Sequence, residues 1–149
     1  MMANLHHGNQ NGELTTIYDS LFECKSKRKQ SPSPIHKKLD IQGKNLLEWL
    51  STKLNFNSTR RILDAGCGTG NTLFWLFERY GSPGIGLSLS KKEISYPQAQ
   101  QQSLPNQIIS FETRDLTSPL NDLNTFDFII CIESLKHVAN TTEAIKNLM

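Results

Sequence analysis

A carboxylate stands next to a run of glycines near the middle of this 149-residue sequence. Asp64 lies two positions before Gly66, and further glycines follow at 68 and 70, in the order Asp-Ala-Gly-Cys-Gly-Thr-Gly. Because glycine has no Cβ, a ligand can approach the backbone of such a turn closely. The carboxylate would repel a pyrophosphate, but it suits a positively charged ligand. We therefore expect this turn to bind a small molecule that carries a cationic group, with a tight turn that binds nothing as the alternative.

The segments around this turn alternate between strand and helix patterns. Strands are predicted over residues 61–65, 84–89, 108–113 and 126–132, and helices over residues 72–80, after the capping pair Ser90 and Glu93, and from Thr141 or Thr142 onward. Pro97 should kink or shorten the middle helix. Strands that alternate with helices pair in parallel through right-handed crossovers. We therefore expect an α/β fold, a Rossmann-like three-layer sandwich with a mainly parallel sheet, in which the glycine turn lies at the ligand-binding ends of the strands.

The first third of the sequence differs from the rest in charge. Residues 1–57 hold eight Lys or Arg and five Asp or Glu, whereas residues 58–149 hold eight and nine. We expect a flexible basic lead-in over residues 1–33, an amphipathic helix over residues 34–57 that packs on the domain, and the domain itself over residues 58–149. A basic run can bind nucleic acid, but this one has no interleaved aromatic residues, so we expect no nucleic-acid partner.

The composition is that of a globular protein with one domain. Hydrophobic residues make up 37% of the chain and charged residues 20%, which excludes a disordered chain. The three cysteines form no CxxC pair, so neither a zinc site nor a disulfide framework is expected. No apolar run approaches the roughly 20 residues that span a bilayer, and no signal peptide is recognisable. We expect no membrane span and a cytoplasmic location.

The glycine turn resembles the first motif of the class I S-adenosylmethionine-dependent methyltransferases. Residues 86–90 resemble the end of the second strand in that family, and residues 114–120 resemble the aspartate of the third strand and its loop. Residues 126–138 resemble the fourth-strand segment of members that act on sugars, sterols and natural products. The four motifs occur in the family's order over about residues 58–149. The resemblance implies S-adenosylmethionine as cofactor and methyl transfer to a small-molecule acceptor.

The resemblance also implies a role for each matching residue. Asp64 would lie near the methionine ammonium of the cofactor, and Gly66, Cys67 and Gly68 would form the turn that packs against it. Ser88 stands where most members have an acidic residue that bonds both ribose hydroxyls, so a weaker ribose contact is implied. The thiol of Cys67 is expected to be a small packed group rather than a nucleophile.

The later motifs imply contacts to the other parts of the cofactor. Asp115 would accept a hydrogen bond from the adenine amino group, and the backbone of Leu116 would pair with the edge of the ring. Ile132 would contribute main chain beneath the methionine portion. The alternative for Asp115 is a solvated turn residue that follows a strand.

Two side chains after the fourth strand are candidates for a catalytic base. Methyl transfer from a sulfonium is an in-line displacement, so much of the catalysis comes from holding acceptor and methyl group in line. An oxygen acceptor also benefits from a base. His137 is the first candidate and Glu133 the second. The alternatives are a histidine that packs or caps near the next helix, and a glutamate that orients substrate or bonds to backbone.

The expected core is incomplete, because members of this family usually have seven strands and four are predicted here. We expect the N-terminal half of the methyltransferase fold, with a second copy or a partner chain covering the apolar edge of the fourth strand. The alternative functions are a non-catalytic methyltransferase-like subunit, or an inactive truncated product that needs a partner. An NAD-type dehydrogenase domain is disfavoured, because Asp64 and the glycine spacing do not suit a pyrophosphate.

Overall fold

The computed structural model describes residues 46–102, 104 and 108–149. The lead-in expected over residues 1–33 and the first part of the helix expected over residues 34–57 lie outside the described residues. The second part of that helix is present as α3 (Leu46–Lys53), which ends four residues before the predicted bound at residue 57.

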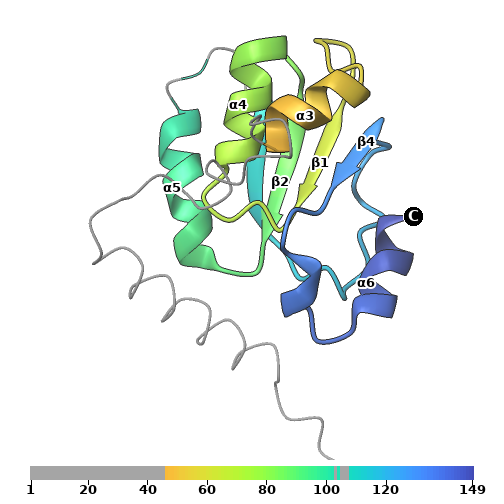
Figure 1. The fold of residues 1–149 in the computed structure, drawn as a ribbon. Helices are drawn as coiled ribbons and strands as arrows, with labels where there is room; N and C mark the ends of the chain where they lie inside the picture. Colours follow the sequence, from red (N-terminus) through yellow and green to blue (C-terminus); the bar gives the residue numbers. More distant parts are fainter. Residues whose placement is uncertain (1–45, 103, 105–107) are drawn as a thin grey trace, which may run out of the picture.

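Four parallel strands form a single sheet in the order β3-β2-β1-β4 (Figure 1). The strands are β1 (Ile62–Ala65), β2 (Gly84–Ser88), β3 (Ile109–Thr113) and β4 (Phe128–Ile130), and the other helices are α4 (Asn71–Tyr80), α5 (Lys91–Gln101), the short 3-10 helix η2 (Leu135–His137) and α6 (Thr141–Leu148). Within the sheet, Asp64 on β1 is paired with Gly86 on β2 and with Ile130 on β4. The prediction of an α/β fold with a parallel sheet is confirmed.

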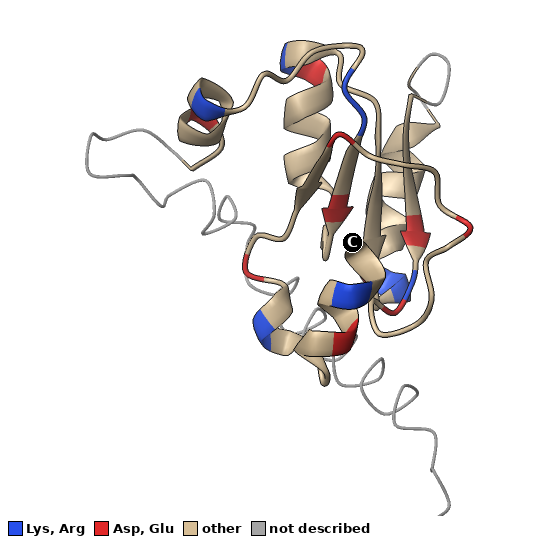
Figure 2. Cartoon of the chain, turned by 90° about the vertical axis from the view of Figure 1, so that its right-hand side faces the viewer, with Lys and Arg blue, Asp and Glu red and all other residues tan. Residues whose placement is uncertain are grey.

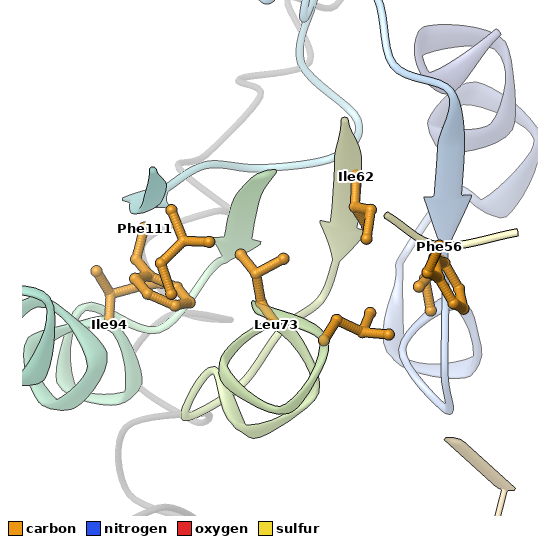
Figure 3. Close-up of a cluster of buried hydrophobic side chains, with 8 residues drawn as sticks. Phe56, Ile62, Leu73, Ile94 and Phe111 are labelled. Carbon is orange, nitrogen blue, oxygen red and sulfur yellow. The ribbon is translucent and has the colours of Figure 1, made fainter. Parts of the chain in front are cut away.

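Two hydrophobic clusters make the domain three-layered. The first contains Leu73 of α4 and Ile94 of α5 packed on Ile62, Phe111 and Phe56 (Figure 3). The second lies on the opposite face of the sheet, because Leu63 and Ala65 of β1 alternate with Ile62 of the first cluster. Ala144 of α6 belongs to the second cluster, so α6 covers that face. The alternation along β1 directs Asp64 to the same face as Ile62.

Two later elements, β4 and α5, also differ from the sequence-based expectation. Strand β4 is three residues long, whereas residues 126–132 were expected to be extended; the chain leaves the sheet after Ile130. Helix α5 continues to Gln101, so Pro97 does not shorten it. Pro97 is buried and lies close to Gly70, and this packing offsets the lost backbone hydrogen bond. Helix α4 ends at Gly81, whose φ is +68°, and the predicted cap at Ser90 is confirmed.

Charged residues are mixed over the described part of the chain. It holds nine Lys or Arg and ten Asp or Glu, so the basic excess of the sequence lies outside it. Figure 2 shows basic and acidic residues on several elements rather than gathered on one. Among the described residues, no helix has both the length and the apolar character that a membrane crossing requires.

Candidate functional site

The glycine turn between β1 and α4 is anchored to the end of β2. The backbone N–H groups of Gly66 and Cys67 both donate to the carbonyl oxygen of Leu87, each at 2.8 Å. The φ angles of Gly66 and Gly68 are +92° and +55°, in a region that L side chains rarely adopt. The turn therefore needs glycine for its backbone path, and the Leu87 carbonyl fixes its place at the carboxyl end of the sheet.

The glycines of this turn serve two different purposes. A Cβ at Gly66 would overlap the Cβ of Ser134, and a Cβ at Gly70 would lie 2.6 Å from the Phe111 ring. Packing within the protein therefore requires glycine at these two positions. A Cβ at Gly68 would meet no atom within 4 Å, so this glycine faces open space. Gly68 is thus the position where a ligand can approach the backbone, and packing does not explain it.

Asp64 is a buried carboxylate. Its exposed fraction is 3%, and Oδ2 is a buried side-chain oxygen that has no hydrogen-bond partner among the residues described. Burial raises the pKa of Asp64 to about 7, because the charged form loses its hydration. An uncompensated buried carboxylate is costly. A bound ammonium group would supply the missing partner, so this site fits a cationic ligand.

Ser88 at the end of β2 is bonded to Glu93 in the first turn of α5. The Ser88 hydroxyl donates to Glu93 Oε2 at 2.9 Å and accepts from the Ser90 N–H at 3.2 Å. Ser90 Oγ in turn accepts from the Glu93 N–H at 3.1 Å, which caps the helix. The sequence alone predicts only a capping role for Glu93. Its position three residues into a helix that begins at the strand end was the signal for a site residue, because such a side chain extends back toward that end.

Asp115 and Leu116 follow β3 and are held by neighbouring residues. Asp115 Oδ1 accepts from both the N–H and the hydroxyl of Thr117, each at 2.8 Å. This is the turn-stabilising arrangement that was the alternative for Asp115. Leu116 is buried in the second cluster, and its carbonyl accepts from Asn147 of α6 at 3.1 Å. Both residues occupy the carboxyl end of the sheet, as the motif order requires.

The segment after β4 returns to the glycine turn through Ser134. The Ser134 hydroxyl donates to the Ala65 carbonyl at 2.6 Å, a contact that no local pattern in the sequence indicates. Glu133 has a φ of +57°, which turns the chain, and its carboxylate lies 3.5 Å from the Lys136 ammonium. His137 is exposed on η2, and its backbone N–H donates to the Ser134 carbonyl at 3.0 Å. Both candidate bases are therefore on one loop, which contacts the turn at Gly66.

A cavity of about 410 Å³ lies between α3 and the β4 segment. Its lining is apolar apart from Glu133 and includes Leu50 of α3, Ile129 and Ile132. Ile132 also packs against the first hydrophobic cluster. One wall of this cavity is formed by Leu46, Leu50 and Leu54, which belong to the segment predicted as an amphipathic helix.

Cys67 is shielded from reaction. Burial raises the pKa of its thiol, and the nearby carboxylates of Asp64 and Glu93 raise it further. The neutral thiol is a poor nucleophile, in agreement with the packed role expected for it. Within the part of the chain that the structure describes, no group of three or more His, Cys, Asp or Glu residues is placed to hold a metal ion.

Comparisons with known proteins point to one family. Residues 63–149 match the model of a methyltransferase domain. The chain is 33% identical over 93 residues to norajmaline N-methyltransferase of Rauvolfia serpentina, an alignment that covers 60% of this chain and 31% of that protein. It is 32% identical over 90 residues to a ubiquinone biosynthesis O-methyltransferase of Coxiella burnetii, covering 59% of this chain and 37% of that protein. The chain thus spans about a third of these relatives.

Solved structures show the same fold. Magnesium protoporphyrin IX methyltransferase of Synechocystis PCC 6803 with bound SAM superposes with a TM-score of 0.69 at 20% identity, over 96% of this chain and 72% of that one. The cyclase SpnF superposes with a TM-score of 0.70 at 18% identity, over 93% and 54%. Because one of the two is described as a cyclase, the fold alone does not decide the reaction.

Proposed function

This chain belongs to the class I S-adenosylmethionine-dependent methyltransferases, and from that premise we propose that it carries the cofactor-binding half of an enzyme that methylates a small-molecule acceptor. The observation that carries the proposal is Asp64, whose buried Oδ2 has no partner among the described residues. An ammonium group, such as that of the methionine part of the cofactor, would compensate this charge. The open face of Gly68 next to it supports the same ligand.

Each of the other site residues contacts one part of the cofactor. Gly66, Cys67 and Gly68 form the cradle for the methionine part, and the main chain of Ile132 lies beneath it. Ser88 lies at the strand end where the ribose binds. Asp115 accepts from the adenine amino group, and the backbone of Leu116 pairs with the ring edge.

The chemistry then depends on position and on a base. S-adenosylmethionine, when bound, supplies a methyl group on a positively charged sulfur. The fixed turn and the β4 loop hold the reactants in line, and this positioning supplies most of the rate. For an oxygen acceptor, His137 is the proposed base that removes the proton, with Glu133 as the second candidate. Relatives that are named as N- and O-methyltransferases support a small-molecule acceptor.

Calorimetric titration of the 149-residue chain with S-adenosylhomocysteine tests this function. We expect saturable binding that Asp64→Asn weakens about tenfold or more, because the charged partner of the ammonium is lost. Asp122→Asn is the matched control, since Asp122 is exposed and paired with Arg114. A chain that is folded by circular dichroism but gives no binding heat would contradict the proposal.

A second candidate is a non-catalytic subunit that completes its sheet with another chain. Within the described residues β4 pairs with β1 on one side only, and Ile129 is 44% exposed at this edge. An uncovered apolar edge favours association with a second copy or a partner chain. A purified chain that is monomeric, stable and active in methyl transfer on its own would exclude this candidate.

A further inference from the structure

The end of β2 is supplied with a carboxylate from outside the strand. Ser88 occupies the strand end, where it is 8% exposed, and the Glu93 carboxylate reaches it from the first turn of α5. We propose that Glu93 is the residue that binds the ribose diol of the cofactor and that Ser88 positions it. This inference rests on the proposed function, because it assigns a second carboxylate to the same site.

The backbone places Glu93 and the glycine turn at the same end of the sheet. Leu87, the residue before Ser88, accepts both backbone hydrogen bonds that anchor the turn. The Ser88–Glu93 pair therefore begins one residue beyond that anchor. Asp64 lies on β1, directly before the turn, and Glu93 lies in the first turn of α5, directly after β2. In agreement with this placement, the negative charges of both carboxylates raise the pKa of the Cys67 thiol within the turn.

The chemistry of the pair suits a diol. A ribose presents two neighbouring hydroxyl donors, and a carboxylate accepts two hydrogen bonds in one plane. A carboxylate has about four lone-pair positions, of which the Ser88 hydroxyl uses one. That hydrogen bond fixes the rotation of the Glu93 side chain. A serine alone offers a single hydroxyl and cannot hold both ribose oxygens in this way.

A purely structural role for Glu93 would be that of a helix-capping residue, and α6 provides the comparison. Glu143 occupies the same place in α6, where its N–H donates to the capping side chain of Asn140 at 3.1 Å. The Glu143 carboxylate lies 3.7 Å from the Lys146 ammonium, and that of Glu93 accepts from a strand-end serine. Glu143→Ala therefore reproduces the helix effect of Glu93→Ala at a distance from the glycine turn.

The experiment compares two ligands on three forms of the 149-residue chain. Affinities for S-adenosylhomocysteine and for its 2′,3′-dideoxy analogue are measured by calorimetry on the wild type, Glu93→Ala and Glu143→Ala. We expect Glu93→Ala to weaken S-adenosylhomocysteine about tenfold or more and to leave the dideoxy analogue unchanged, so that the preference for the diol is lost. Glu143→Ala should change neither affinity. If Glu93→Ala does not fold, Glu93→Gln replaces it, with a smaller loss of the same preference expected.

The outcomes separate the inference from the function on which it rests. No binding of S-adenosylhomocysteine by the folded wild type overturns the proposed function. If the wild type binds S-adenosylhomocysteine and the Glu93 variants keep the same preference for the diol, only the assignment of Glu93 is overturned. Equal weakening of both ligands also overturns it, because a capping defect lowers all binding alike.

Discussion

The hydroxyl of Ser134 donates a hydrogen bond to the carbonyl oxygen of Ala65 across 69 positions of sequence, at 2.6 Å. Ala65 is the last residue of β1, and Ser134 follows β4, so this bond joins the start of the glycine turn to the loop with the two candidate bases. The Cβ of Ser134 also fills the space beside Gly66. The Ser134 side chain therefore holds the glycine turn and the loop of the two candidate bases together.

This contact predicts a large stability loss for Gly66→Ala. The new Cβ would overlap the Cβ of Ser134, and the φ of +92° adds backbone strain, so we expect a loss of about 2–4 kcal/mol in the free energy of unfolding. Urea denaturation monitored by circular dichroism measures it. Gly68→Ala is the control, because its Cβ meets no atom and strain alone costs about 1 kcal/mol. Equal losses in the two variants would contradict the packing role of Ser134.

The buried Asp64 predicts that stability falls as the pH rises. Its pKa is about 7 in the folded protein and 3.8 without burial, so the folded state holds the proton more tightly. The stabilising contribution is complete below pH 3.8 and is lost as the pH rises to about 7, by at most about 4 kcal/mol. Urea unfolding at intervals between pH 4 and pH 8 measures this slope. In Asp64→Asn the contribution of this carboxyl group to the pH dependence of the free energy of unfolding should disappear. The prediction is refuted if the variant and the wild type show the same pH dependence.

The same carboxyl predicts proton release on ligand binding. A bound ammonium favours the charged carboxylate and lowers the pKa of Asp64, so near pH 6.5 binding of S-adenosylhomocysteine should release part of a proton. Titrations in buffers of different ionisation enthalpy measure the number of protons released. Methylthioadenosine is the matched control, because it lacks the ammonium and should release fewer. Equal release with both ligands would show that Asp64 does not face the ammonium.

The exposed edge of the sheet predicts self-association through β4. We expect the 149-residue chain to form dimers or larger species, and Ile129→Lys to shift it toward the monomer, because a charge on an edge strand opposes pairing. Light scattering after size exclusion measures the mass. Ile145→Lys, at a 41% exposed position on α6, is the control and should leave the mass unchanged. A wild-type monomer would remove the reason for a partner at this edge.

The features that the sequence predicted are those that depend on near neighbours. The strand, glycine turn and helix from Ile62 to Tyr80 follow from apolar spacing and from glycine positions, and the stop at Gly81 follows from its backbone freedom. The parallel sheet then follows from the alternation of elements. Asp64 was identified as a candidate because its charge stands directly beside the turn.

The features that the sequence missed depend on tertiary contacts. Nothing near Ser134 indicates that it bonds to Ala65, because the two meet only after the sheet has formed. Glu93 was recognised as a cap, but its contact with Ser88 depends on where α5 begins relative to β2. Pro97 was expected to disturb its helix, and its close approach to Gly70 was not visible in the local pattern. The cofactor and base roles of individual residues are still predictions that the experiments above test.

The ring of Phe111 occupies the space that side chains at both Gly70 and Gly86 would fill. One aromatic group on the third strand thus acts as a spacer that sets how far the glycine turn stands above the sheet. A smaller residue at position 111 would let the glycine turn move toward the sheet. The geometry of the proposed cofactor site at this turn would then change, although none of its own residues had been altered. Directed changes of ligand preference can therefore be sought at a buried position beneath the glycine turn.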